Sequence, residues 1–214
     1  MKMDKQIIWD WNGTLFNDVD LCVESINYLL SLQHLPQLSN KEAYQKVFRF
    51  PIIEYYQALG FDFTKYSFDD LAIKYMEYYQ PRSLACSLYE HAQECLQYFH
   101  NKGYRQILLS ASKKIYLMNQ LKQFPIRDMF EQILALDNIH AYSKAELALN
   151  YMKQHSVSSK NFIFIGDSVH DYEVAQAANA SCILIANGHE HKERLQKTNA
   201  IIVNHIGEVQ KIIT

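Results

Sequence analysis

The stretch Ile7-Ile8-Trp9-Asp10-Trp11-Asn12-Gly13-Thr14-Leu15 decides the fold of this chain. Its first three residues are apolar and predict a short buried strand, and Gly13-Thr14 predicts a turn soon after the strand ends. Asp10 then stands at the carboxyl end of the strand, where its carboxylate can act as a nucleophile toward a phosphoryl group. Two positions later stands Asn12, whose amide cannot deliver a proton at neutral pH.

Short apolar runs further along the chain predict more strands of the same sheet. The strong ones cover residues 106–109, 162–165 and 182–185, and the weaker ones cover 133–136 and 200–203. They are brief, rich in β-branched or aromatic residues, and separated by helical patterns. This alternation predicts an α/β protein with a Rossmann-like parallel sheet at its core. Polar residues follow the strong strands, at the edge where open parallel sheets bind ligands.

A long insertion follows the first strand. Residues 10–105 are far more than a simple βαβ crossover needs. Within them, the segment 17–83 has helical patterns throughout, and Pro81 is predicted to stop its last helix. We therefore expect an all-α cap domain of residues 17–83. The core domain would comprise residues 1–16 and 84–214.

The composition excludes several classes of partner. A formal net charge of −2 provides no electrostatic attraction to nucleic acid or to an anionic membrane. The four cysteines lack the spacing of a disulfide framework or a zinc site. No signal peptide is recognisable, and no apolar run approaches the ~20 residues that span a bilayer. We expect a cytoplasmic protein that binds neither nucleic acid nor membrane, with its oligomeric state left open.

Four elements that suit phosphoryl transfer occur in order along the chain. The stretch that begins at Ile7 is followed by Ile107-Leu108-Leu109-Ser110, by Lys144 at the start of a predicted helix, and by Ile165-Gly166-Asp167-Ser168-Val169-His170-Asp171. With a helical insertion after the first element, this order resembles the haloacid dehalogenase (HAD) superfamily. The similarity is greatest to its phosphoglycolate-phosphatase-like branch, which has a helical cap, and it covers the whole chain.

The resemblance implies a role for each charged residue of these elements. Asp10 would attack phosphorus and carry an aspartyl-phosphate. Mg²⁺ would be bound by Asp10, by the backbone carbonyl of Asn12 and by Asp167, since this ion prefers oxygen ligands. Asp171 would complete the metal site through a bound water or would hold Lys144. Lys144 would add a positive charge that keeps Asp10 ionised.

Other residues are expected to bind the substrate. Ser110 would donate its hydroxyl to the phosphoryl oxygens, next to backbone N–H groups that donate to the same oxygens. Arg49, in the predicted cap, is equally consistent with contacting the substrate and with an exposed surface position. The backbone N–H groups expected in this phosphoryl cradle are those of Gly13, Thr14, Ala111 and Ser112.

These features predict a Mg²⁺-dependent phosphatase that hydrolyses a small phosphorylated metabolite. Asn12 departs from the family pattern, which has at this position an Asp that protonates the leaving group. Such acid–base help is worth ~10²–10⁴ in rate, so the enzyme would be slow or restricted to good leaving groups such as acyl phosphates and anhydrides. Two alternatives remain. One is a catalytically impaired HAD protein that binds a phosphorylated ligand or a protein partner, and the other is a phosphonatase or dehalogenase.

Three further patterns bear on these alternatives. The pair Asp167 and Asp171 disfavours a dehalogenase, because dehalogenases lack the metal-binding acids of the last element. The group His189-Glu190-His191 has the composition of a metal site, but its spacing on a polar loop indicates a solvent-exposed segment. The tyrosines of the predicted cap, Tyr75 and Tyr79 among them, are expected mainly in its core and rim.

Overall fold

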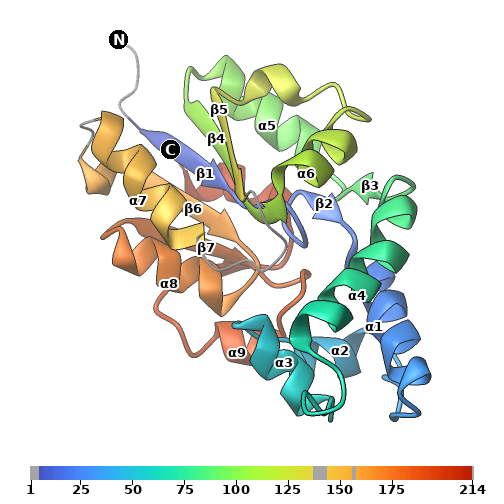
Figure 1. The fold of residues 1–214 in the computed structure, drawn as a ribbon. Helices are drawn as coiled ribbons and strands as arrows, with labels where there is room; N and C mark the ends of the chain where they lie inside the picture. The colour runs from blue at the N-terminus through green and yellow to red at the C-terminus, as the bar shows by residue number, and fades with distance from the viewer. Residues whose placement is uncertain (1–4, 137–143, 156–157, 214) are drawn as a thin grey trace.

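The computed structural model describes residues 5–136, 144–155 and 158–213. They form a six-stranded parallel sheet of strand order β5-β4-β1-β6-β7-β8, covered by helices on both faces (Figure 1). This is the α/β architecture that the sequence predicts, and the two weaker strands, β5 and β8, are also present. The strands are β1 (Gln6–Trp9), β4 (Arg105–Lys113), β5 (Gln132–Leu136), β6 (Phe162–Gly166), β7 (Ser181–Ile185) and β8 (Ile201–Val203).

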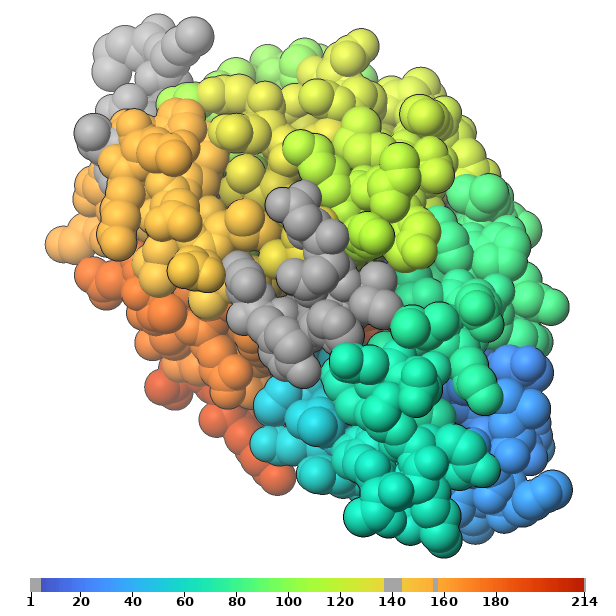
Figure 2. All heavy atoms as spheres, in the orientation of Figure 1, coloured from blue at the N-terminus to red at the C-terminus, as the bar shows by residue number. Residues whose placement is uncertain are grey.

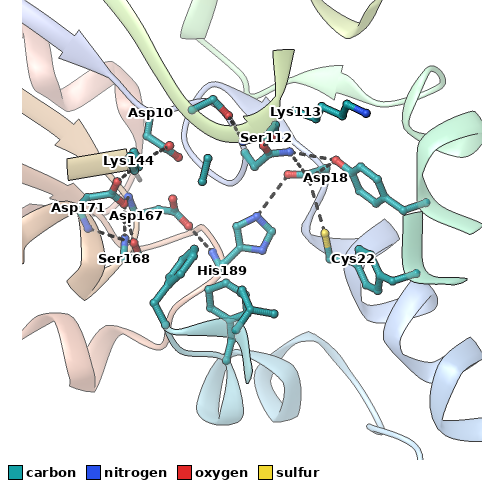
Figure 3. A pocket seen from close by; sticks show the side chains of 18 of the residues that line it. Asp10, Asp18, Cys22, Ser112, Lys113, Lys144, Asp167, Ser168, Asp171 and His189 are labelled. Atoms are coloured by element: carbon teal, nitrogen blue, oxygen red, sulfur yellow. Dashed lines mark hydrogen bonds and ion pairs between the residues drawn. The ribbon is translucent and has the colours of Figure 1, made fainter. Parts of the chain in front are cut away.

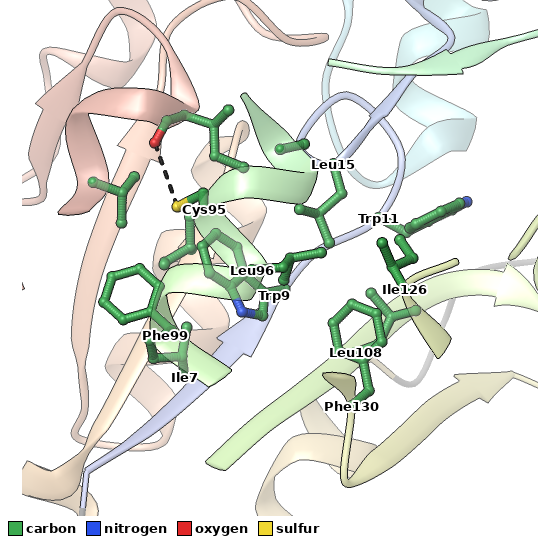
Figure 4. Close-up of a cluster of buried hydrophobic side chains, with 14 of the residues drawn as sticks. Ile7, Trp9, Trp11, Leu15, Cys95, Leu96, Phe99, Leu108, Ile126 and Phe130 are labelled. Carbon is green, nitrogen blue, oxygen red and sulfur yellow. Dashed lines mark hydrogen bonds between the residues drawn. The ribbon is translucent and has the colours of Figure 1, made fainter. Parts of the chain in front are cut away.

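The central strand β1 distributes its side chains to two hydrophobic layers. It pairs with β4 on one side and β6 on the other, and all of its residues are buried. Because successive side chains of a strand point to opposite faces, Ile7 and Trp9 enter one cluster and Ile8 enters the other. In the first cluster, Trp9 packs against Phe99 with ring centroids 6.1 Å apart (Figure 4).

The core helices follow the same division. On the face of Ile7 and Trp9 lie α5, α6 and α10, and on the face of Ile8 lie α7, α8 and α9. No helix in the described segments is both long and apolar enough to cross a membrane. The core helices are α5 (Ala92–Asn101), α6 (Lys114–Leu121), α7 (Lys144–His155), α8 (Val169–Ala177), α9 (Lys192–Leu195) and α10 (Val209–Ile212).

The inserted helices form a third hydrophobic cluster of their own. They occupy one end of the molecule, beside the carboxyl ends of the sheet strands (Figures 1 and 2). Side-chain caps start two of them, because Asn40 accepts a hydrogen bond from the Ala43 N–H (2.9 Å) and Ser67 accepts one from Asp70 (3.1 Å). The helices are α1 (Val19–Leu32), α2 (Lys41–Val47), α3 (Ile52–Ala58) and α4 (Phe68–Ser83).

The prediction that Pro81 stops the last inserted helix is wrong. Helix α4 continues through Pro81 to Ser83. A proline in the last turn removes one backbone hydrogen bond, whereas the added turn carries Ser83 into the interior. There the Ser83 hydroxyl accepts a hydrogen bond from the side-chain amide of Gln120 (2.9 Å), so tertiary contacts outweigh the local signal.

The chain enters and leaves the inserted helices through two neighbouring strands. β2 (Phe16–Asn17) and β3 (Ser87–Leu88) pair antiparallel, with Phe16 opposite Leu88 and Asn17 opposite Ser87. Strands of this length carry no recognisable alternation of apolar residues, so the sequence does not predict them. The pairing brings both ends of the insertion to the same point of the core.

A buried polar pair within the first cluster can be tested by substitution. Gln106 accepts a hydrogen bond from the indole N–H of Trp9 (2.9 Å) and donates one to the Leu96 carbonyl (3.0 Å). Gln106→Leu leaves the indole N–H of Trp9 buried without its acceptor, so the free energy of unfolding is expected to fall by about 1–3 kcal/mol. Urea denaturation measures this change. The control Gln93→Leu, on the exposed face of α5, should shift it by less than about 0.5 kcal/mol, and equal shifts would contradict the assignment.

Candidate active site

A cavity of about 190 Å³ lies between the carboxyl edge of the sheet and the inserted helices. Figure 3 shows side chains from both sides converging on it. From the core come residues that follow β1, β4, β6 and β7, as expected for an open parallel sheet. The core residues that line it are Asp10, Asn12, Ser110, Ala111, Ser112, Lys113, Lys144, Asp167, Ser168, Asp171 and His189.

Asp10, Lys144 and Asp171 form one connected ionic group. The Lys144 ammonium, 5% exposed, donates to Oδ1 of Asp10 and to Oδ1 of Asp171. Burial and the charges of Asp171 and Asp167 raise the pKa of Asp10 to about 8, and Lys144 opposes this shift. Burial favours the neutral amine of Lys144, but the two carboxylates outweigh it and raise its pKa. Lys144 and the two neighbouring carboxylates therefore shift the pKa of Asp10 in opposite directions.

Asp167 and Asp171 are fixed by hydrogen bonds from different parts of the chain. Asp167 accepts one from the Thr14 hydroxyl (2.9 Å) and one from the His189 N–H (2.6 Å). Asp171 closes a capping box with Ser168 at the start of α8. Burial raises the pKa of Asp167 to about 6. For Asp171, the charge of Lys144 and the hydrogen bonds outweigh burial, so its pKa is lowered.

These carboxylates have the chemistry of a hard-cation site. One oxygen atom from each of Asp10, Asp167 and Asp171 can be chosen so that all lie within 4.8 Å of one another. Three buried carboxylates face the one ammonium of Lys144 here, so the group carries excess negative charge that a divalent cation would neutralise. All three donors are oxygens, which Mg²⁺ prefers. The residues present therefore fit a magnesium ion.

Gly13 is required by the close packing of the loop after β1. Its φ is +72°, and a Cβ there would lie 2.4 Å from the carboxylate of Asp167 and 2.4 Å from the ring of His189. The Gly13 N–H donates to the Phe16 carbonyl (2.9 Å) and to the Asp18 carboxylate (3.0 Å), and the Thr14 N–H donates within the same loop.

The expected phosphoryl cradle is thus corrected in part. The N–H groups of Gly13 and Thr14 already have partners inside the loop, and neither residue lines the cavity. Gly13 instead permits the close approach of the neighbouring side chains, and Thr14 orients Asp167 through its hydroxyl. Ser110, Ala111 and Ser112 do line the cavity, on the other side of the nucleophile candidate.

Arg49 is the second correction. It does not line the cavity, and its guanidinium donates to the backbone carbonyl of Val47 (3.1 Å). The residues on either side of it, Phe48 and Phe50, do line the cavity. The chain around Arg49 therefore turns its aromatic side chains, and not its cation, toward the site.

Asn12 is held by three polar neighbours. Its amide N–H₂ donates to Asp18 (2.7 Å) and to the hydroxyl of Tyr79 (3.0 Å), and its carbonyl oxygen accepts from the Ser112 hydroxyl (2.7 Å). Tyr79 in turn donates to Asp18 (2.6 Å). Asn12 thus connects the core to helix α4 of the insertion.

His189 faces Asp18 across the same network (Figure 3). Its Nε2 lies 3.5 Å from Oδ1 of Asp18, and its Nδ1 lies 2.9 Å from the hydroxyl of Tyr44. Burial lowers the pKa of His189, but the Asp18 carboxylate outweighs it and raises the pKa to about 8. The His189 cation and hydrogen bonds from Tyr79 and Asn12 lower the pKa of Asp18 despite its burial. The two residues form a buried ion pair.

The prediction that the His189 segment is solvent-exposed is wrong. His189 is 7% exposed and Glu190 is 1% exposed. Helix α2 covers this loop, because Lys41 donates to the Asn187 carbonyl (3.0 Å) and Gln45 donates to the Gly188 carbonyl (2.7 Å). Sequence reasoning therefore missed His189 and Asp18. The signal available for His189 was its position directly after the predicted strand 182–185, at the same edge of the sheet.

The fold and site together define an α/β protein with a group of carboxylates at the carboxyl edge of a parallel sheet. The family model described as haloacid dehalogenase-like hydrolase matches residues 7–185. The chain belongs to this family.

Curated relatives and solved structures agree with this assignment. The chain is similar to the phosphoglycolate phosphatases of Aliivibrio fischeri (21% identical, covering 94% of this chain and 92% of the relative) and Vibrio parahaemolyticus (25%, 98% and 96%). It has the fold of a haloacid dehalogenase-like family hydrolase from Streptococcus pneumoniae (TM-score 0.80, 18% identical, 100% of both chains). It shares that fold with the Protein Tyrosine Kinase A of Mycobacterium tuberculosis (TM-score 0.80, 20%, 97% of both chains).

The ion pair of His189 and Asp18 predicts a dependence of stability on pH. The pKa of His189 rises from 6.5 to about 8 on folding, so its contribution is fully present below pH 6.5 and is lost as the pH rises through about 8. In metal-free protein, the difference in free energy of unfolding between wild type and His189→Gln should decrease by about 2 kcal/mol over this range. The exposed control His100→Gln should show no such trend. A pH-independent difference for His189→Gln would refute the ion pair.

Proposed function

We propose that this protein is a Mg²⁺-dependent phosphatase that hydrolyses a small phosphorylated metabolite through an aspartyl-phosphate on Asp10. The observation that carries the proposal is the group of Asp10, Lys144, Asp167 and Asp171 at the core side of the cavity. The relatives that are named phosphatases support the reaction class. Their sequence identity is too low to carry over their substrate.

The residues of the site suit the first step of this reaction. Asp10 would attack phosphorus, and Lys144 beside it would reduce the charge repulsion between the nucleophile and the phosphoryl oxygens. The Ser110 hydroxyl lies on the same cavity wall and would donate to a phosphoryl oxygen. When bound to Asp10, the Asn12 carbonyl and Asp167, with Asp171 beside them, Mg²⁺ would supply further neutralisation of negative charge. In the second step, water would release inorganic phosphate and restore the carboxylate.

Asn12 limits which esters this site can hydrolyse. It stands where the family has an acid, and its side chain can hydrogen bond but cannot protonate a leaving oxygen. Substrates whose leaving group departs without a proton are therefore favoured. The alternative is a protein that binds a phosphorylated ligand and turns it over negligibly, and the first experiment below separates the two.

We further propose that residues 17–83 act as a cap domain that opens around β2 and β3. The cap is held to the core by the hydrogen bonds from α2 to the loop before His189, by the polar network that Asp18 and Tyr79 form with Asn12 and His189, and by the paired linkers. Opening would admit substrate, and closure would exclude water from the nucleophile.

Trapping with beryllium fluoride tests the nucleophile. We expect a Mg²⁺-dependent adduct on Asp10, visible by ¹⁹F NMR, together with hydrolysis of acetyl phosphate. Asp10→Asn should abolish both, because it removes the nucleophilic oxygen. The exposed control Asp128→Asn should change neither. Persistent hydrolysis in Asp10→Asn would rule out the covalent mechanism, and wild-type protein with neither adduct nor hydrolysis would support the binding protein.

Replacing Asn12 with Asp tests the missing acid. The new carboxylate oxygen would take the place of an amide nitrogen that lies 2.7 Å from Asp18. Two carboxylates at this distance share a proton, so residue 12 would be a protonated acid facing the cavity. Asn12→Asp should raise kcat for glycerol 1-phosphate, a poor leaving group, by more than twofold, and Asn12→Ala should not. A gain of twofold or less would show that the acid is not what limits the reaction.

A further inference from the structure

The part of the cavity contributed by the insertion is apolar and largely aromatic. The ring of Phe50 stacks on the ring of His170, which belongs to the core, with centroids 4.6 Å apart and planes inclined by 27°. This contact joins the insertion to the core, and Phe50 itself lines the cavity. The apolar lining residues from the insertion that do not hydrogen bond to the site are Phe48, Phe50, Ile52, Tyr75 and Met76.

The same wall offers nothing to bind an anionic leaving group. Of the described residues that line the cavity, the insertion contributes no Lys or Arg, and its one charged residue is the carboxylate of Asp18. The core supplies Lys144, Lys113 and His189. Lys144 binds Asp10 and Asp171, His189 is paired with Asp18, and the ammonium of Lys113 points away from Asp10 (Figure 3). A carboxylate such as that of phosphoglycolate would therefore meet an apolar surface and a like charge. The leaving group that fits is uncharged.

The volume of the cavity limits the size of the leaving group. It measures about 190 Å³, and an apolar protein cavity of about 150 Å³ accommodates one benzene molecule. With the phosphoryl group placed at Asp10, a single aromatic ring fills the remaining space.

Within the described residues, the side chain at the usual acid position and its polar neighbours are not free to protonate the leaving oxygen. Asn12 cannot supply a proton, the hydroxyl of Tyr79 already donates to Asp18, and both ring nitrogens of His189 face partners. A phenol loses its proton near pH 10, as tyrosine does, whereas water does so only near pH 16. A phenolate is therefore a leaving group that this site can expel without an acid.

We propose that the substrate class is the monoaryl phosphates, with one uncharged aromatic ring held between Phe48, Phe50 and Tyr75. The inference rests on the proposed phosphatase function. In the reaction, Asp10 forms a bond to phosphorus while the bond from phosphorus to the aryl oxygen breaks, and the oxygen leaves with the electron pair as phenolate. Solvent protonates the phenolate. Water then cleaves the aspartyl-phosphate and yields inorganic phosphate.

Steady-state kinetics with a matched set of substrates test this specificity. Phenyl phosphate has the proposed ring and leaving group, 4-carboxyphenyl phosphate adds a charge, benzyl phosphate keeps the ring but leaves as an alkoxide, and phosphoglycolate lacks the ring. We expect kcat/KM for phenyl phosphate to exceed each of the other three by at least tenfold. A value for phosphoglycolate equal to or above that for phenyl phosphate would overturn the inference.

Two variants of the wall separate ring binding from the chemistry. Phe50→Ala should raise KM for phenyl phosphate at least fivefold more than it raises KM for acetyl phosphate, since that substrate has no ring. Phe63→Ala, in the insertion but outside the cavity, should change neither. Met76→Lys, which adds a cation to the wall, should shift the preference toward 4-carboxyphenyl phosphate at least tenfold. Absence of both the KM effect and the shift would contradict the assigned wall.

These outcomes distinguish the specificity from the function beneath it. If acetyl phosphate is hydrolysed and Asp10 forms the adduct, but phenyl phosphate is not preferred, the phosphatase stands and the aryl specificity is wrong. If no phosphate compound is hydrolysed and no adduct forms, both proposals are wrong.

Discussion

The site depends on the burial of three carboxylates around one ammonium. Asp10, Asp167 and Asp171 repel one another, and burial strengthens that repulsion. Lys144 and a set of hydrogen bonds from Thr14, Ser168 and backbone N–H groups hold them in place. This arrangement costs free energy of folding, and the large apolar layers on both sides of β1 offset that cost. The excess negative charge that remains suits the site to a divalent cation.

Much of this site could be predicted from the sequence, because the position of its residues follows from the direction of the parallel strands. Parallel strands place their carboxyl ends at one edge, so Asp10, Ser110 and Asp167 had to converge once their strands were recognised. The family resemblance then placed Lys144 beside them. Two-residue strands and a proline inside a helix could not be predicted, since both depend on contacts between segments distant in the sequence.

Asp18 and His189 were missed for a related reason. Each lies in a loop or at a helix start, and neither has a spacing that points to the other. They meet because helix α2 covers the loop before His189, a contact between the insertion and the core. The same contact buries His189 and raises its pKa. A buried ion pair of this kind has no sequence pattern, because its two residues come from the core and from the insertion and meet only in the folded protein.

The structure also changes the meaning of Asn12. In the sequence, Asn12 is notable because it replaces the Asp that the family pattern has at this position. In the folded chain its amide is bound to Asp18 and Tyr79 and its carbonyl to Ser112, so it links the core to helix α4. An amide suits this position because it donates on one side and accepts on the other, as a carboxylate could not. The amide at position 12 and the buried ion pair of Asp18 and His189 thus belong to one hydrogen-bond network.

The pairing of β2 with β3 has an evolutionary consequence. The two ends of the insertion are hydrogen-bonded neighbours. The polypeptide therefore enters and leaves the inserted helices at the same place on the core. Such an insertion can be replaced, lengthened or altered as a unit, while the strands of the core sheet keep their pairing register. Asp10 and the aromatic cavity residues Phe48, Phe50 and Tyr75 are therefore encoded on separate pieces of chain, and substitutions in the insertion can alter the cavity without disturbing the carboxylates at the sheet edge.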